Sequence, residues 1–265
     1  MSAKICSAQT ACIWEDPDRA LVRAEGMVRE AAERGADLIA FPEQFATGWS
    51  PRSVHFAEGT DGRIVSTLRR YAAEHAVAIL GSFVEAGQPM PCNTCVAIGA
   101  DGALLGTYAK IHLFTPGGEQ EHYTAGESLL VFTVGNVRFG VAICYDLRFP
   151  ELFRLYAEAG VECMLEPAAW PCSRLTAWEL LLRVRALENQ FYAAGINCSG
   201  ETPVDRYCGG SVASDPIGTI LMRGGAGEEL LDFSVDPEVI ARTRRRMPVE
   251  RDRREDLYSR LKQGL

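Results

Sequence analysis

The chain has 265 residues and a formal net charge of −8, and 47% of its residues are apolar while 23% are charged. These values are ordinary for a globular protein with a sizeable core, and the acidic balance argues against a nucleic-acid-binding surface. One basic run, Arg242 to Arg246, interrupts this balance, and we interpret it as a solvated helix face or a subunit contact. Residues 1–9 lack the apolar core of a signal peptide and no run reaches the length of a membrane span, so we expect a cytoplasmic protein without a membrane partner.

The first half of the chain predicts alternating strands and helices. An apolar stripe at 3.6-residue spacing, which Gly35 ends, predicts the first long helix. The segment Asp37 to Phe41 (DLIAF) predicts a strand buried on both faces. Gly99 to Gly102 carry the turn residues of a β-hairpin. We therefore expect strands at 4–12, 37–41, 77–84, 93–98 and 103–108, and helices at 17–34 and 62–76.

The second half repeats this pattern after a Gly-rich loop at 115–127. We expect strands at 137–143, 161–165, 191–197, 209–214, 219–222 and 230–235, and helices at 150–159, 176–190 and 237–246. The helix at 176–190 places five apolar residues on one stripe, Leu180, Leu181, Val184, Leu187 and Phe191. The order of elements favours an α/β fold with two mixed sheets packed face to face and helices outside, in one domain over residues 1–265. Residues 249–265 form a charged tail that we expect to pack on a partner subunit.

Cys144 is the candidate nucleophile. The residues before it alternate between apolar and polar or small types, which predicts a strand with one buried face. This strand stops at Cys144, and Pro150 opens the next helix. Backbone N–H groups at such an abrupt strand end lack ladder partners, so they can face a substrate. The chain has nine cysteines, and an odd number in a long chain favours reduced thiols over a disulfide framework.

Glu43 and Lys110 complete a candidate catalytic set. Glu43 follows a buried strand, at the end where open α/β sheets place their sites. Of the 27 basic residues 24 are arginines, and Lys110 is the one lysine far from both ends, so either chemistry requires a compact ammonium there or the position arose by chance. A carboxylate can take the thiol proton, and an ammonium favours the thiolate and the oxyanion formed on attack. Such a set can cleave an acyl–nitrogen bond through a thioester.

Four segments resemble the nitrilase-like carbon–nitrogen hydrolases. These segments are FPEQFATGW around Glu43, YAKIHLF around Lys110, GVAICYDLRFPEL around Cys144, and WELLLRVRALENQ in the later helix. The resemblance covers essentially the whole chain. It implies a four-layer α-β-β-α sandwich that assembles into homodimers or larger homo-oligomers.

The resemblance also implies a role for each residue of the set. Glu43 is expected to be the general base, Lys110 the oxyanion stabiliser and Cys144 the nucleophile. The family's second glutamate matches Glu119, with Glu121 as a nearby competitor of lower rank. No cofactor is implied.

Within the family the chain looks closest to the ω-amidases, which hydrolyse the terminal amide of small 2-oxo acids such as 2-oxoglutaramate and 2-oxosuccinamate. We expect the backbone N–H of Tyr145 to bind the oxyanion, and Trp170 either to line the pocket or to pack ordinarily. A substrate carboxylate needs a counter-charge, for which Arg174 is the first candidate. Arg148 is the second, with a structural ion pair to Asp146 or Glu151 as its alternative role. An N-carbamoyl amino acid amidohydrolase, a deaminated-glutathione-type amidase and a nitrilase are the alternative activities.

Three other interpretations are less favoured. Cys92-x-x-Cys95 suggests zinc or redox chemistry, but a second CxxC or His pair is missing, so we expect no metal. Cys144 with His112 suggests a Cys–His hydrolase, but His112 lies in an apolar segment typical of a structural histidine. A non-enzymatic interaction protein is disfavoured because the catalytic set is complete.

Overall fold

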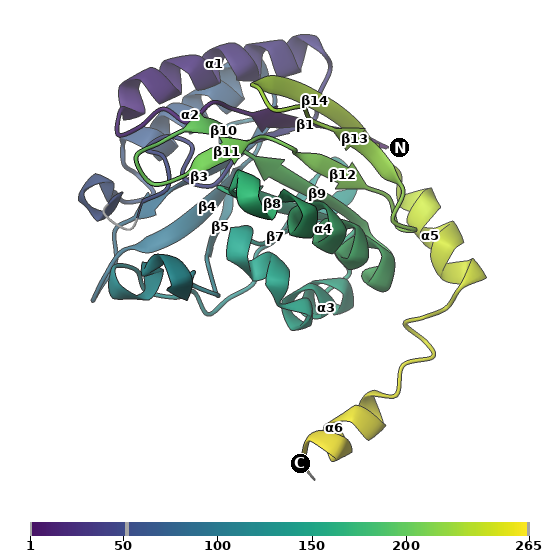
Figure 1. Ribbon diagram of the computed structural model, residues 1–265. Helices are drawn as coiled ribbons and strands as arrows, with labels where there is room; N and C mark the ends of the chain where they lie inside the picture. Colours follow the sequence, from purple (N-terminus) through teal and green to yellow (C-terminus); the bar gives the residue numbers. More distant parts are fainter. Residues whose placement is uncertain (1, 51–52, 264–265) are drawn as a thin grey trace.

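The computed structural model describes residues 2–50 and 53–263, which form two six-stranded mixed sheets packed face to face with helices on their outer faces (Figure 1). The strand orders are β14-β1-β2-β3-β4-β5 and β13-β12-β9-β8-β7-β6. The first sheet contains β1 (Ala3–Gln9), β2 (Leu38–Ala40), β3 (Ala78–Glu85), β4 (Cys92–Ile98), β5 (Leu104–Ala109) and β14 (Glu229–Val235). The second contains β6 (Val131–Val134), β7 (Val137–Val141), β8 (Cys163–Ala168), β9 (Tyr192–Asn197), β12 (Val212–Ser214) and β13 (Ile220–Arg223). The predicted four-layer α-β-β-α sandwich is confirmed.

The layers are held together by three apolar cores. One core lies between the two sheets and contains Phe139 and Phe233. A second lies between the first sheet and the helices α1 (Pro17–Glu33) and α2 (Arg63–His75). A third lies between the second sheet and the helices α3 (Pro150–Glu158) and α4 (Leu175–Asn189). Strands in the middle of each sheet are therefore covered on both faces, which explains their continuous apolar sequences.

The parallel strands of each sheet position the site. In the first sheet β1, β2 and β3 are parallel neighbours, and the chain leaves β2 toward Glu43. In the second sheet β7, β8 and β9 are parallel neighbours, and the chain leaves β7 toward Cys144. The carboxyl ends of parallel strands are the usual place for a ligand in α/β sheets, and here two such ends, one from each sheet, contribute to one site.

The apolar stripe predicted for α4 is wrong in part, because Phe191 is fully buried but two leucines of the stripe are exposed. The buried face of the helix consists of Trp178, Leu182, Arg185, Ala186 and Asn189, whereas Leu180 and Leu187 are exposed. Burial of the Arg185 guanidinium is possible because it donates two hydrogen bonds to the Leu147 carbonyl, 3.1 and 2.9 Å long, so its polarity is satisfied. Helix α4 thus buries a charged residue, Arg185, and exposes two apolar ones, Leu180 and Leu187.

Some short elements had no counterpart in the sequence patterns. These are β6, the hairpin of β10 (Ser199–Glu201) and β11 (Arg206–Cys208), and several 3₁₀ turns, of which η3 (Glu119–Glu121), η4 (Cys144–Arg148) and η5 (Cys172–Arg174) lie near the site. Such elements are too short to show a period, and contacts with the rest of the fold stabilise them.

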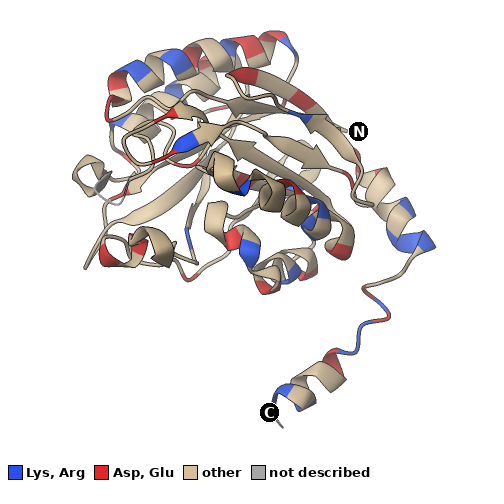
Figure 2. Ribbon diagram, viewed as in Figure 1, with Lys and Arg blue, Asp and Glu red and all other residues tan. Residues whose placement is uncertain are grey.

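The C-terminal segments lie at the periphery. Helix α5 (Pro237–Arg246) ends in the predicted basic run, and Figure 2 shows these arginines gathered at its last turn. Cations at a helix C-terminus complement the helix dipole. Helix α6 (Glu255–Gln263) lies at the end of an extended segment away from the sheets and buries none of its residues (Figure 1). The last two residues of the predicted tail lie outside the described residues. Among the described helices, none is long and apolar enough to span a membrane.

Candidate active site

Cys144 lies at a sharp turn just beyond β7, where it begins η4. Its φ is +48°, a left-handed conformation that is uncommon for a residue with a side chain. Such backbone strain persists only where the surrounding structure imposes it, and it is frequent at active sites. The turn directs the partly buried thiol into a pocket that Glu43 and Lys110 also line.

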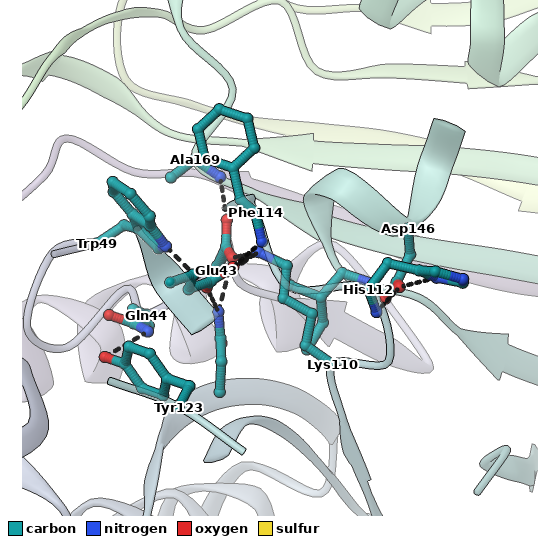
Figure 3. Close-up of polar contacts among 12 residues, drawn as sticks. Glu43, Gln44, Trp49, Lys110, His112, Phe114, Tyr123, Asp146 and Ala169 are labelled. Carbon is teal, nitrogen blue, oxygen red and sulfur yellow. Dashed lines mark hydrogen bonds and ion pairs between the residues drawn. The ribbon is translucent and has the colours of Figure 1, made fainter. Parts of the chain in front are cut away.

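Lys110 lies between two buried carboxylates, those of Glu43 and Glu119, and Figure 3 shows the lysine beside Glu43. Its Nζ is 2.8 Å from Oε1 of Glu43 and 2.9 Å from Oε2 of Glu119. Asn93 donates to both glutamates, at 2.8 and 3.0 Å. The other oxygen of Glu43 accepts from the Ala169 N–H at 2.9 Å, so both carboxylate oxygens of Glu43 are held in place.

Glu119 is the glutamate that the structure brings to the site, and not Glu121. Glu119 is fully buried, and it accepts from Trp49 Nε1 at 3.1 Å and from the Phe114 N–H at 2.6 Å. Glu121 belongs to the same short turn but is exposed. Glu119 lies behind Lys110 and anchors the ammonium and the loop after it.

Burial and neighbouring charges together shift the pKa values of this cluster. Burial alone would lower the pKa of Lys110, but the carboxylates of Glu119 and Glu43 raise that pKa well above its usual value. Burial would raise the pKa of Glu119, but Lys110 lowers it below its usual value. Burial and the neighbouring Glu43 raise the pKa of Cys144 well above that of a free thiol, against the opposing effect of Lys110. The resting thiol therefore keeps its proton at neutral pH.

The remaining walls of the pocket are aromatic and cationic. The pocket has a cavity volume of about 40 Å³ and is partly open to solvent. The guanidinium of Arg174 lies 4.9 Å from the ring centre of Phe114, and that of Arg148 lies 5.0 Å from the ring of Trp170. Stacking on aromatic rings orients both guanidinium groups without neutralising them.

The structure thus brings seven of the eight predicted site residues to one pocket, with Glu119 directly behind it. Sequence reasoning did not find several neighbours: Trp49, Asn93, Phe114, Asp205 and Tyr207. Asn93 is a polar residue in a buried strand, a signal that could have found it. Arg148 stacks on Trp170, while the alternative partner Asp146 binds other groups.

The structure tests two expectations, that the cysteines are reduced and that His112 is structural. Cys172 and Cys208 form a disulfide, so the expectation that all nine cysteines are reduced thiols is wrong for this pair. The bond joins η5 to β11 beside the pocket, two segments that packing brings together although 36 residues separate them. His112 binds Asp146 through Nδ1 at 2.8 Å and stacks on Phe149, which supports the structural interpretation.

Fold and site together define a class: an α-β-β-α hydrolase with a thiol, a carboxylate and an ammonium in one pocket. The sequence of residues 4–245 matches the carbon-nitrogen hydrolase family, and the chain belongs to that family. It is a hydrolase acting on carbon–nitrogen bonds other than peptide bonds, as the resemblance implied.

Three known proteins illustrate the similarity. The chain is 35% identical over 250 residues to Omega-amidase NIT2 of Xenopus tropicalis, which covers 90% of this chain and 91% of the relative. It is 33% identical over 244 residues to 2-oxoglutaramate amidase of Bacillus subtilis, covering 91% and 94% of the two chains. Its fold is similar to that of XC1258 from Xanthomonas campestris, a CN-hydrolase superfamily protein, with a TM-score of 0.91, 30% identity and coverage of 96% and 98%.

Proposed function

We propose that this protein is an ω-amidase that hydrolyses the terminal amide of a small carboxylate-bearing substrate, 2-oxoglutaramate or 2-oxosuccinamate, to the acid and ammonia. One observation carries the proposal. A single pocket contains the Cys144 thiol, the Lys110–Glu43 pair, and the guanidinium groups of Arg148 and Arg174, neither of which forms an ion pair among the described residues. The similarity to ω-amidases over 90% of the chain supports it.

The first half-reaction would form a thioester. Because burial and Glu43 keep the thiol protonated, Glu43 takes the proton as Cys144 Sγ attacks the amide carbon. The negative charge on the amide oxygen is stabilised by the Lys110 ammonium and the backbone N–H of Tyr145. Glu43 then passes its proton to the nitrogen, the carbon–nitrogen bond breaks, and ammonia leaves.

The second half-reaction would release the acid. Glu43 accepts a proton from a water molecule, and the resulting hydroxide attacks the thioester carbon. The same oxyanion contacts act again, the carbon–sulfur bond breaks, and the thiolate of Cys144 regains a proton from Glu43. Glu119 does not exchange protons in this scheme. It holds Lys110 at 2.9 Å and positions the loop through the Phe114 N–H.

The carboxylate end of the substrate would bind Arg174, with Arg148 as the second cation. Phe114 and Trp170 orient these side chains, and a planar guanidinium suits bidentate binding of a carboxylate. The pocket also receives Asp205 from the β10–β11 hairpin, whose negative charge disfavours a second substrate carboxylate placed near that hairpin.

Ammonia release from a substrate panel tests the activity. The panel contains 2-oxoglutaramate, 2-oxosuccinamate, an N-carbamoyl amino acid, a neutral aliphatic amide and a nitrile. We expect the two 2-oxo amides to be hydrolysed with the highest kcat/KM. Cys144→Ala should abolish the reaction while Cys92→Ala, a partly buried cysteine outside the pocket, leaves it intact. Turnover of the nitrile but not of the amides would refute the proposal.

We also propose that the chain acts as one catalytic unit, as a cytoplasmic homodimer or larger homo-oligomer. Three exposed apolar residues support a subunit contact: Leu180 and Leu187 of α4, and Ile217, which precedes the Gly218 that lies against Leu187. The α6 helix, which buries none of its residues within its own chain, supports packing on a partner.

The cysteines bear on the compartment. Seven free cysteines support a reducing compartment, whereas the Cys172–Cys208 disulfide favours an oxidising one. Sedimentation and thiol counting in a fresh lysate test these points.

A further inference from the structure

We infer that Asp146 is a positioning residue for the hydrolysis, because it joins the lysine segment on one sheet to the cysteine turn on the other. The inference rests on the roles proposed above for Lys110 and Cys144. Asp146 lies two residues after the nucleophile in η4 and is fully buried. It does not line the pocket, so it acts only through its neighbours.

The carboxylate of Asp146 stabilises the turn that contains Cys144. Its Oδ2 accepts the Ile143 N–H at 2.9 Å, while the Asp146 N–H donates to the Ile143 carbonyl at 3.0 Å. These reciprocal bonds close the chain around Cys144 from both sides. They give a specific physical cause for the φ of +48° at the nucleophile, a conformation that needs support to persist.

The same carboxylate accepts hydrogen bonds from residues on both sides of Lys110. Tyr108, two residues before the lysine, donates its hydroxyl to Oδ2 at 2.7 Å. His112, two residues after it, donates its backbone N–H to Oδ1 at 2.8 Å and places Nδ1 at 2.8 Å from the same oxygen (Figure 3). The backbone of Lys110 itself is held at Asn93 and Gly126, so its segment has little freedom once these contacts form.

This arrangement matters because the proposed catalytic groups come from different sheets. Lys110 follows β5 of the first sheet, and Cys144 follows β7 of the second. The apolar core between the sheets is strongly cohesive, but the hydrophobic effect that stabilises it is not directional. Hydrogen bonds to a buried carboxylate are short and directional, and they determine the relative position more sharply. Catalysis is sensitive to such shifts, since displacement by about 1 Å can cost about 100-fold in rate.

A matched pair of tyrosine variants tests the inference. Tyr108→Phe removes one hydroxyl that binds Asp146. Tyr156→Phe removes one hydroxyl that is also fully buried but bonds the Val141 carbonyl and the Leu130 N–H instead. We expect both variants to lose thermal stability to a similar extent. Only Tyr108→Phe should lower kcat, by about tenfold, with KM changed less than twofold, because substrate contacts are intact while the thiol and the ammonium are misaligned.

A double-variant cycle provides a second measurement. In an Asp146→Ala background the Tyr108 hydroxyl has lost its acceptor at position 146, so adding Tyr108→Phe should lower kcat by less than twofold further. Equal kcat losses in Tyr108→Phe and Tyr156→Phe, or full additivity in the double variant, would overturn the positioning role. If instead Cys144→Ala still releases ammonia, the proposed function fails, and that result is distinct from either tyrosine outcome.

Discussion

The ammonium of Lys110 lies 2.8 Å from Oε1 of Glu43, and both side chains are only 1% exposed. Glu119 adds a second carboxylate at 2.9 Å, so one cation compensates two anions in a region nearly closed to water. Separating any of these charges from its partners would leave an uncompensated charge in a medium that solvates it poorly. The cluster therefore contributes both to the proposed chemistry and to stability, and the two effects can be measured separately.

Replacement of Lys110 by methionine should lower both the activity and the stability of the protein. We expect kcat/KM to fall by a factor of about 10²–10³, because an oxyanion contact is lost. The free energy of unfolding should fall by about 3–5 kcal/mol, because Glu43 and Glu119 are left buried as like charges. Urea denaturation and ammonia release measure the two effects, and Lys262→Met, an exposed lysine, serves as the control. Unchanged stability would mean that the carboxylates are neutral without the lysine.

Glu43→Gln should separate thiol reactivity from amide hydrolysis. Glu43 raises the pKa of Cys144 through its charge and through a hydrogen bond, so its neutralisation should lower that pKa. The midpoint of the pH profile for alkylation by iodoacetamide should therefore move to lower pH. Amide hydrolysis should nevertheless be lost, because glutamine cannot act as the general base. A midpoint that stays in place would show that the two groups do not interact.

Arg174→Met should affect charged substrates selectively. Loss of a charge-assisted hydrogen bond of about 1.5–3 kcal/mol should raise KM for 2-oxoglutaramate by about 10- to 100-fold. KM for a neutral aliphatic amide should change little, because that substrate has no carboxylate to bind. Arg183→Met, a change on the neighbouring helix outside the pocket, is the matched control. If KM rises equally for both substrates, Arg174 shapes the pocket and does not bind the substrate carboxylate.

Glu166→Gln should stabilise the protein at alkaline pH. Glu166 is fully buried on β8, and neither carboxylate oxygen has a hydrogen-bond partner among the described residues. Burial and the nearby Asp146 raise its pKa well above 4.5, so the folded protein keeps the acid neutral while the unfolded chain ionises it. Stability from this group is complete below the unfolded pKa and is lost as pH rises. The amide variant should therefore be more stable than the wild type at pH 8 and equally stable at pH 4. Glu127→Gln, at an exposed position, should show no such pH-dependent gain.

The Cys172–Cys208 disulfide predicts a thiol count and a stability difference. Unfolding without reductant should expose seven reactive thiols, and nine after reduction. A cross-link that closes a loop of 36 residues contributes about 2–4 kcal/mol, so Cys172→Ala with Cys208→Ala should lower stability by that amount. Cys12→Ala with Cys92→Ala, two free and partly buried cysteines, controls for the loss of two cysteine side chains. Nine thiols without reductant would show that the bond does not form in solution.

The sequence by itself determined the strand-end positions of Glu43 and Cys144, the helices and most strands, and the family. Apolar periodicity records which faces are buried, and the motifs around the three catalytic candidates are local, so both survive in the linear chain. The α4 stripe failed because periodicity cannot tell a face that packs on the sheet from an apolar face left exposed, as at Leu187.

Only the tertiary structure decided which groups meet. Asp146 reaches Tyr108 across 38 residues and Glu43 reaches Lys110 across 67. Cys172 pairs with Cys208 for the same reason, although composition favoured free thiols. Each contact depends on how the two sheets and their connecting loops pack, and a burial pattern along the chain carries no information on that register. The sequence therefore identified the chemical groups, while the packing of one sheet on the other decided their partners and distances.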